Sequence, residues 1–315
     1  MQSIVVDNLS KTYRRGRVRA LDGVSLKVEP GETLGVIGPN GAGRTTLLGC
    51  MLGFLRPDSG TVSIDGHAPD DLAVRSSTGY LPERLVLDRW MTGTGFLRHH
   101  HALARLPGET RAADCEAALD RVGLERDAGA QTIGRYSRGM LQRLGFAQAL
   151  LGSPRLLFLD EPISGVDPSG VLLFRRILGE LSSSGVTVIL NSHQLAEVER
   201  VCTRVVFVQK GRIESMETVR AGAASARVLR VRLSTYAPEG GGVSGARLAG
   251  IAAAAGASYR EWVAPEARFG VSDDAGATRL LAALLAAGMP VVEAAPEEGR
   301  LERLFTAGPP AGGAS

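Results

Sequence analysis

Short apolar runs alternate with helical patterns through the first 220 residues of the chain. Three runs, at 33–37, 156–159 and 186–190, are almost continuously apolar, which is typical of strands buried on both faces of a parallel sheet. Between them, apolar residues recur with helical spacing over 47–55, 92–124 (with a break at Pro107-Gly108), 136–151 and 168–181. This alternation of strands and helices predicts an α/β fold.

Shorter segments predict additional strands at 4–6, 24–28 and 61–64, and a hairpin within 204–214. The segment 11–15, which contains Tyr13, is expected to be a polar loop. We expect residues 1–220 to form one large domain, with a helical subdomain at about 87–150.

The pattern changes beyond residue 220. Small residues at 221–227 predict a linker, and 228–307 combines two Ala/Leu-rich helical segments with short strands, which predicts a small α+β accessory domain. The Gly- and Pro-rich segment 308–315 is expected to be a disordered tail.

A glycine-rich segment, 38–46, connects the apolar run 33–37 to a helical pattern and reads Gly38-Pro39-Asn40-Gly41-Ala42-Gly43-Arg44-Thr45-Thr46. A strand, a glycine-rich loop and a helix are the context of a phosphate-binding loop. Glycines allow successive backbone N–H groups to turn inward around an anion, and the start of the helix adds the positive end of its dipole. Thr45 is placed to ligate Mg²⁺, and Thr46 to cap the first helical turn. An ordinary strand-to-helix turn is the alternative for this segment taken alone.

Two acids, Asp160 and Glu161, directly follow the apolar run 156–159. Ligands of open α/β sheets bind at the carboxyl ends of the strands. Because unpaired acids beside a buried strand are rarely structural, we expect a catalytic or metal-binding role. His193 follows the next apolar run, 186–190, and by itself would more often be a structural histidine.

Composition limits the class of protein. The 315 residues suit two domains, and 44% apolar and 22% charged residues are ordinary for a globular protein. A net charge of +3 is too small to indicate a nucleic-acid partner. The first ten residues lack the apolar core of a signal peptide, and the apolar runs are too short to cross a bilayer, so a membrane role would require a separate partner chain.

The motifs from Tyr13 to His193, in their order, resemble the nucleotide-binding subunit of ATP-binding-cassette (ABC) transporters over about residues 2–220. The resemblance implies a P-loop NTPase cassette with a mixed sheet core and a helical subdomain. It assigns Tyr13 to adenine stacking, residues 38–46 to the Walker A loop and Glu83 to the Q-loop. It also assigns 137–140 to the signature motif, Asp160 and Glu161 to the Walker B motif, 164–167 to the D-loop and His193 to the switch position.

The resemblance also implies an ATPase. Glu161 would orient or deprotonate the attacking water, His193 would contact the γ-phosphate, and Thr45, Asp160 and Glu83 would hold Mg²⁺. The nucleotide would be bound by a larger set: Tyr13, Gly38, Asn40, Gly41, Gly43, Arg44, Thr45, Thr46, Glu83, Ser137, Gly139 and Asp167. Of these, Ser137 and the backbone N–H of Gly139 would contact the γ-phosphate from the opposite subunit.

Two partners follow from the resemblance: a second cassette, identical or different, and a separate integral membrane permease, with no nucleic acid. The extension beyond residue 220 and the segment 79–83 resemble exporter-type cassettes. The chain is then expected in the cytoplasm, peripheral on the inner face of the cell membrane.

The sequence departs from the family pattern at Arg44, where lysine is usual, at Glu83, where glutamine is usual, and at Arg138 and Met140 in the signature motif. Arginine is longer and forked, so the exchange is not conservative at a phosphate site. We expect weak hydrolysis that Arg44→Lys would raise about tenfold, unless a neighbour such as Glu83 compensates. Two alternatives remain: a catalytically weak, regulatory subunit paired with an active cassette, and a soluble ABC protein without a permease.

Overall fold

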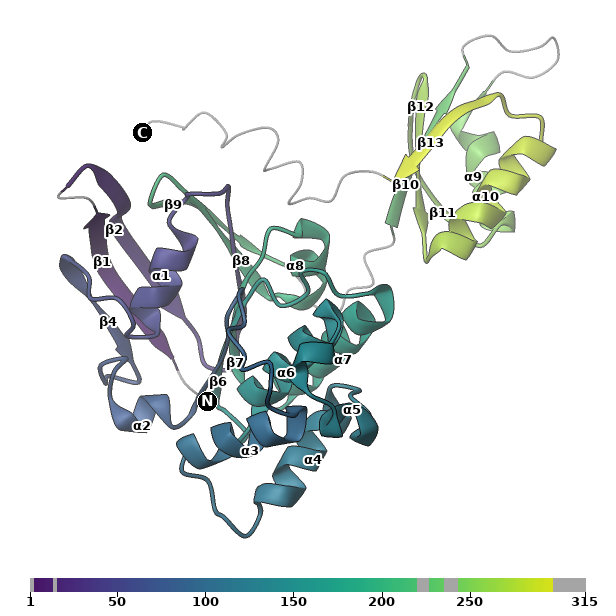
Figure 1. Cartoon of the computed structure of the whole chain (residues 1–315). Coiled ribbons are helices and arrows are strands. Elements are labelled where there is room, and N and C mark those ends of the chain that lie inside the picture. Colours follow the sequence, from purple (N-terminus) through teal and green to yellow (C-terminus); the bar gives the residue numbers. More distant parts are fainter. Residues whose placement is uncertain (1–2, 14–15, 220–226, 235–242, 297–315) are drawn as a thin grey trace. The chain divides into compact units, whose positions relative to one another are not determined.

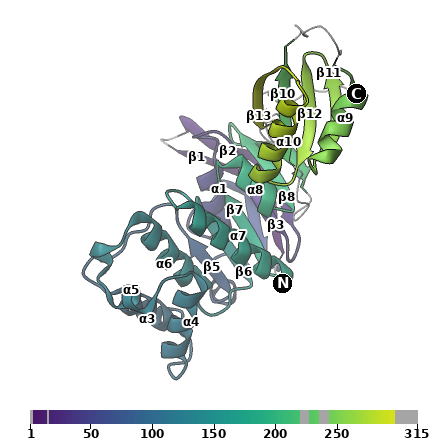
Figure 2. The same cartoon turned by 90° about the vertical axis from the view of Figure 1, so that its right-hand side faces the viewer.

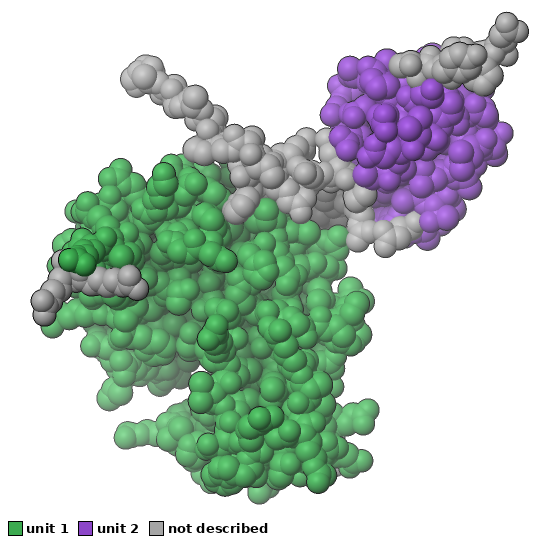
Figure 3. Space-filling model, turned by 45° about the horizontal axis from the view of Figure 1, so that its top comes forward, with its two compact units in different colours: residues 1–221, 309–315 green, residues 222–308 purple. Residues whose placement is uncertain are grey.

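The computed structural model of the chain describes residues 3–13, 16–219, 227–234 and 243–296. The chain divides into two compact units, one formed by residues up to 221 and the other belonging to 222–308 (Figure 3). The tail expected at 308–315 and residues 221–226 of the expected linker lie outside the described residues. Arg227, the last residue of that expected linker, is instead the first residue of a strand.

A six-stranded mixed sheet forms the centre of the first unit (Figure 1). Its strand order is β5-β6-β7-β3-β8-β9, and only β9 runs antiparallel to its neighbour. The three central strands are buried along their whole length, as their continuous apolar runs predict. The strands are β3 (Thr33–Ile37), β5 (Thr78–Leu81), β6 (Leu156–Asp160), β7 (Thr187–Asn191), β8 (Arg204–Gln209) and β9 (Arg212–Thr218).

A second, antiparallel sheet has the order β2-β1-β4 and comprises β1 (Ile4–Tyr13), β2 (Val18–Val28) and β4 (Ser59–Ile64). Helix α1 (Arg44–Met51) packs with this sheet and with residues of β6, β7 and β8 in one apolar core. The expectation that Tyr13 lies in a loop is wrong, because Tyr13 pairs with Val18 at the end of β1. Pairing with β2 therefore extends β1 beyond its apolar residues.

Several of the remaining helices form the helical part of the first unit seen in Figures 1 and 2: α3 (Gly93–Leu103), α4 (Arg111–Arg121), α5 (Arg126–Ala130), η1 (Ile133–Arg135) and α6 (Arg138–Leu150). Outside this part, α7 (Pro168–Ser183) contacts α8 (Leu195–Val201), and α2 (Leu72–Arg75) lies beside β5. Gly35 on β3 allows α8 to approach closely, since a Cβ there would lie 2.6 Å from Cγ1 of Val198. No helix within the described ranges is long and apolar enough to cross a membrane.

The second unit has the order β10 (Arg227–Leu233), α9 (Gly245–Ala254), β11 (Ser258–Val263), β12 (Glu266–Val271), α10 (Asp274–Ala286), β13 (Val291–Pro296). Its antiparallel sheet has the strand order β11-β12-β10-β13, which is the ferredoxin-like arrangement. Leu229, Val231 and Leu233 pack into the core with residues of both helices.

The opposite face of this sheet carries alternating charges, because neighbouring side chains of a strand point to opposite faces. Arg232 pairs with Glu293 at 3.1 Å, and Arg230 pairs with Glu266 at 3.5 Å. We call the whole set the charge ladder: Arg230, Arg232, Arg268, Glu261, Glu266 and Glu293.

Candidate functional site

The glycine-rich segment follows β3 and ends where α1 begins. Its three glycines, Gly38, Gly41 and Gly43, have φ angles of 158°, 78° and 107°, which residues with a side chain rarely adopt. A Cβ on Gly38 would lie 2.1 Å from the carbonyl oxygen of Val208, and one on Gly43 would lie 2.2 Å from that of Ala20. The loop therefore requires glycine at both positions for space as well as for backbone conformation.

The turn between β8 and β9 supports this loop. The backbone N–H of Gly211 donates to the carbonyl oxygen of Ala42 at 2.8 Å, and the carbonyl oxygen of Gly211 accepts from Asp22 N–H at 2.8 Å. Helix α1 begins at Arg44 with Gly43 as its N-cap and no side-chain cap. The expectation that Thr46 caps the helix is wrong, because Thr46 already lies within its first turn.

The carboxyl ends of β6 and β7 lie side by side, since Asp160 is paired in register with Asn191. Both residues are buried, with 3% and 2% of their surface exposed. Glu161 follows with a φ of 49°, which is uncommon for a residue other than glycine, and its N–H donates to the carbonyl oxygen of Asn191 at 2.9 Å. The strand pairing thus fixes both acids at one point of the sheet edge.

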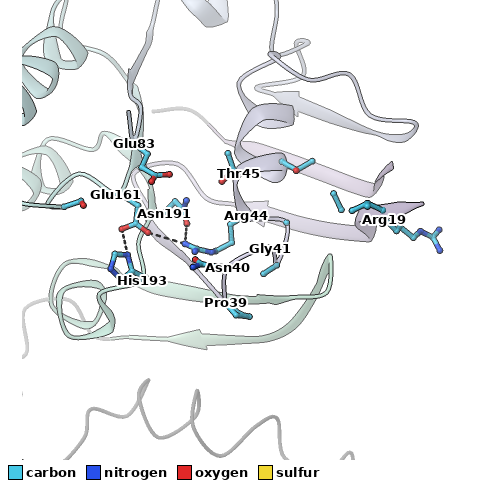
Figure 4. A pocket seen from close by; sticks show the side chains of 16 residues that line it. Arg19, Pro39, Asn40, Gly41, Arg44, Thr45, Glu83, Glu161, Asn191 and His193 are labelled. Atoms are coloured by element: carbon cyan, nitrogen blue, oxygen red, sulfur yellow. Dashed lines mark hydrogen bonds and ion pairs between the residues drawn. The ribbon is translucent and has the colours of Figure 1, made fainter. Parts of the chain in front are cut away.

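Arg44 extends from α1 to these strand ends (Figure 4). Its Nη1 lies 2.5 Å from Oδ1 of Asn191 and 3.5 Å from Oε1 of Glu161. On the other side of Glu161, Oε2 lies 2.8 Å from Nδ1 of His193, and Nδ2 of Asn191 donates to Oδ1 of Asp160 at 2.6 Å. We call these five residues, Arg44, Asp160, Glu161, Asn191 and His193, the strand-end cluster.

The environment of Asp160 opposes its ionisation. Burial raises the pKa of Asp160, and the negative charges of Glu83 and Glu161 raise it further. The hydrogen bond from Asn191 and the charge of Arg44 act in the opposite direction and lower this pKa. A cation bound beside Asp160 would favour the ionised form, as at a metal ligand.

A cavity of about 520 Å³ opens beside the cluster, a volume usual for a ligand site. Nine of the residues expected to bind nucleotide or act on it contribute to its lining: Asn40, Gly41, Gly43, Arg44, Thr45, Thr46, Glu83, Glu161 and His193. Figure 4 shows the side chains of Arg44, Glu83, Glu161, Asn191 and His193 converging on it.

Other expected residues lie outside this lining. Tyr13 is 36% exposed, and the Nζ of Lys11 lies 6.0 Å from the centre of its ring. Ser137 and Asp167 cap the first turns of α6 and α7, and Arg138 donates to Oγ of Ser164, which does line the cavity. The remaining residues outside it are Gly38, Gly139 and Asp160.

Sequence reasoning missed Asn191, which contacts both Arg44 and Asp160. Its signal was weak: it is the polar residue that ends the apolar run 186–190, two positions before His193. The suggested partner of Arg44, Glu83, is not among the contacts described for the guanidinium, which are to Asn191 and Glu161.

The donor set fits a polyphosphate with a divalent cation. Backbone N–H groups of a glycine loop and a buried guanidinium attract anions, whereas carboxylate and hydroxyl oxygens are the ligands that Mg²⁺ prefers. Asp160 and Glu161 are the buried carboxylates described in the site, and Thr45 and Glu83 are exposed residues with oxygen donors.

Comparison with known proteins agrees with this geometry. Residues 21–164 match the family model described as ABC transporter. The uncharacterized ABC transporter ATP-binding protein all4389 of Nostoc is 42% identical over 67% of this chain and 64% of its own length. The daunorubicin resistance ATP-binding protein DrrA3 of Streptomyces coeruleorubidus is 37% identical over 67% of this chain and 66% of its own length. The chain thus spans just under two thirds of these relatives.

The ABC transporter ATP-binding protein YxlF of Bacillus subtilis is 38% identical over 66% of this chain and 68% of its own length. A solved ATP-binding subunit of an ABC transporter has a TM-score of 0.63 and 29% identity, covering 68% of this chain and 89% of that structure. The dimeric cassette MJ0796, bound to ADP and Pi, has the same fold with a TM-score of 0.65, 24% identity, and coverage of 69% of this chain and 99% of that structure. The chain therefore belongs to the ABC transporter family and has the P-loop NTPase cassette fold.

Proposed function

We propose that this chain binds and hydrolyses ATP together with a second cassette and thereby drives a separate membrane permease that exports its substrate. The observation that carries the proposal is the strand-end cluster, which joins the glycine loop to two buried acids and His193. Phosphoryl transfer depends mainly on positioning and charge neutralisation, and this cluster supplies groups for both.

The residues that line the cavity would have separate roles in binding the phosphates and in hydrolysis. The loop N–H groups and Arg44 would bind the phosphates, with Arg44 in the place of the family's usual lysine. Glu161, held by strand pairing on one side and by His193 on the other, would orient the attacking water. His193 is 61% exposed at its side chain, so it can approach a phosphate that enters the cavity.

Magnesium would be held by Thr45 and Asp160, with Glu83 nearby. When bound, the ion would neutralise negative charge on the phosphate oxygens. The pKa of Asp160, raised by burial, gives a reason for this acid to prefer a cation as its neighbour.

The second cassette would complete the site. Ser137, Gly139 and Asp167 lie outside the cavity of their own chain, and Ser137 and Asp167 stand at the exposed starts of α6 and α7. Helix N-termini are suited to phosphate. We propose that Ser137, Gly139 and Asp167 face the nucleotide of the opposite subunit. Tyr13 would stack on the adenine of the nucleotide bound by its own chain.

The direction of transport, export from the cell, is inferred from the names of similar proteins. The printed name of DrrA3 assigns that protein to daunorubicin resistance, which accords with removal of a compound from the cell. A subunit of this kind would reside in the cytoplasm, on the inner face of the membrane, beside its permease.

The direct test is co-purification of the chain with its permease, followed by assays of ATP binding and of Mg²⁺-dependent ATP hydrolysis in that complex. We expect saturable ATP binding and hydrolysis that stops when Mg²⁺ is chelated. A chain that binds no ATP in the complex would refute the proposal.

A weak, regulatory subunit is the second candidate, and Arg44 is the observation in its favour. Steady-state hydrolysis by the natural protein and by Arg44→Lys separates the two. A gain of about tenfold on substitution would favour the weak subunit, equivalent to about 1.4 kcal/mol. No gain would mean that arginine performs the task of the usual lysine.

A further inference from the structure

The structure assigns a positioning role to Asn191: its side-chain amide holds the guanidinium of Arg44 and the carboxylate of Asp160 in one hydrogen-bonded chain, so that an arginine can serve at the phosphate loop. This inference rests on the proposed ATP site. It concerns the orientation of Arg44, not the chemical step.

The geometry leaves one orientation for the amide. A guanidinium only donates hydrogen bonds, and an ionised carboxylate only accepts them. Oδ1 of Asn191 must therefore face Nη1 of Arg44, at 2.5 Å, and Nδ2 must face Oδ1 of Asp160, at 2.6 Å. Both polar groups of the amide are used, in a residue with only 2% of its surface exposed.

The position of this amide is fixed by the sheet. Asn191 is in register with Asp160 across the β6–β7 pair, and its carbonyl oxygen accepts from Glu161 N–H at 2.9 Å. Because the backbone of Asn191 is held by the sheet, its side-chain oxygen is a fixed hydrogen-bond acceptor. This acceptor can fix the orientation of the flexible Arg44 side chain.

Arginine suits this acceptor better than lysine does. An ammonium ends one bond before the position of a guanidinium terminal nitrogen, so lysine at position 44 would stop short of Asn191 in the same rotamer. The two described contacts of Arg44 use Nη1, and a guanidinium carries five N–H donors. Donors thus remain for phosphate oxygens in the cavity that Arg44 lines.

A double-mutant cycle tests the assignment. We would measure the Kd for ATP with the natural protein, Asn191→Ala, Arg44→Lys and the double variant. Positioning predicts that Asn191→Ala weakens ATP binding about tenfold when Arg44 is present and less than about twofold in the Arg44→Lys background. An equal loss in both backgrounds would overturn the assignment, because Asn191 would then support the strand or Asp160 alone.

A readout without nucleotide separates this inference from the proposed function. In thermal unfolding of the nucleotide-free protein, Asn191→Ala should lower the Tm more in the natural protein than in the Arg44→Lys background. Additive shifts would contradict the contact, whether or not the protein binds ATP. If no form binds ATP, the proposed function fails, and this cycle still decides on Asn191.

Two further variants control for folding. Asn191→Ser places a shorter polar group at the same site and should show the same dependence on Arg44. It replaces Asn191→Ala in the cycle if the alanine variant fails to fold. Thr187→Val removes a buried hydroxyl that accepts from Gly31 N–H at 2.9 Å, at the other end of β7. Its effects should be the same in both Arg44 backgrounds; effects that depend on Arg44 would mean that general damage to β7 explains the coupling.

Discussion

The strand-end cluster of the first unit and the charge ladder of the second both bring arginine and carboxylate side chains together, but in different surroundings. In the cluster, Arg44 and Glu161 are 9% and 7% exposed, and their closest described contact is 3.5 Å. In the ladder, Arg232 and Glu293 are 47% and 49% exposed at their side chains and lie 3.1 Å apart. The better-formed ion pair is thus the exposed one.

The difference follows from burial. An exposed pair contributes little, since water and salt screen both charges, so it can form and break freely. Burying an acid lowers the stability of the fold unless another group compensates its charge. The two acids of the cluster have different partners: Asp160 accepts a hydrogen bond from the neutral amide of Asn191, whereas Glu161 contacts Arg44 and His193. Such incomplete pairing leaves capacity for a charged ligand, whereas the ladder is neutral, with three arginines and three glutamates.

The largest effect should come from Glu161→Gln. An amide keeps the size of the side chain but cannot accept a proton from water, so ATP hydrolysis should fall roughly 100- to 1,000-fold while ATP binding persists. The variant should also form an ATP-bound dimer in size-exclusion chromatography with Mg²⁺. Wild-type turnover would remove Glu161 from its role, and a persistent monomer would indicate an obligate pair with a different cassette.

Gly43→Ala tests the loop that supports the cluster. A positive φ and a Cβ only 2.2 Å from the Ala20 carbonyl oxygen should together lower the free energy of unfolding by about 3 kcal/mol. Urea denaturation measures this loss. Gly66→Ala is the matched control, since Gly66 has a φ of 79° but no atom within 4 Å of a Cβ, and it should lose about 1 kcal/mol. Equal losses would mean that the close approach to Ala20 is not limiting.

Arg44→Met removes the buried cation while it keeps most of the side-chain volume. Glu161 and Asn191 then lose their contacts with Nη1, and the free energy of unfolding without nucleotide should fall by about 2 kcal/mol. Chemical denaturation of the nucleotide-free protein measures the change. A more stable variant would show that repulsion within the cluster outweighs these contacts.

Arg232→Met should have the smallest effect. Its exposed pair with Glu293 is expected to contribute less than about 1 kcal/mol, and raising the salt concentration should reduce that further. The same denaturation assay applies. A loss as large as that of Arg44→Met would erase the contrast between the two clusters.

The sequence predicted those parts of the site that depend on local pattern. Continuous apolar runs located β3, β6 and β7. The residues that follow these runs, the glycine loop from Gly38, the acids Asp160 and Glu161, and His193, marked the carboxyl ends of the strands as the site. The partner of Arg44 could not be found in this way, because it depends on β6 and β7 being neighbours and on their register. Pairing between distant segments also explains why Tyr13 lies in a strand, since its partner Val18 is provided by β2.

The contact between Gly211 and Ala42 has a consequence for how the chain acquires its shape during synthesis. A ribosome releases the glycine loop long before it releases β7, β8 and the turn that supports the loop, and β3 pairs with both of these later strands. The nascent loop therefore has neither its neighbours in the sheet nor its support at Ala42 until residue 211 has emerged. We expect the ability to bind a phosphate group to arise late and all at once in translation, when this last segment joins the sheet.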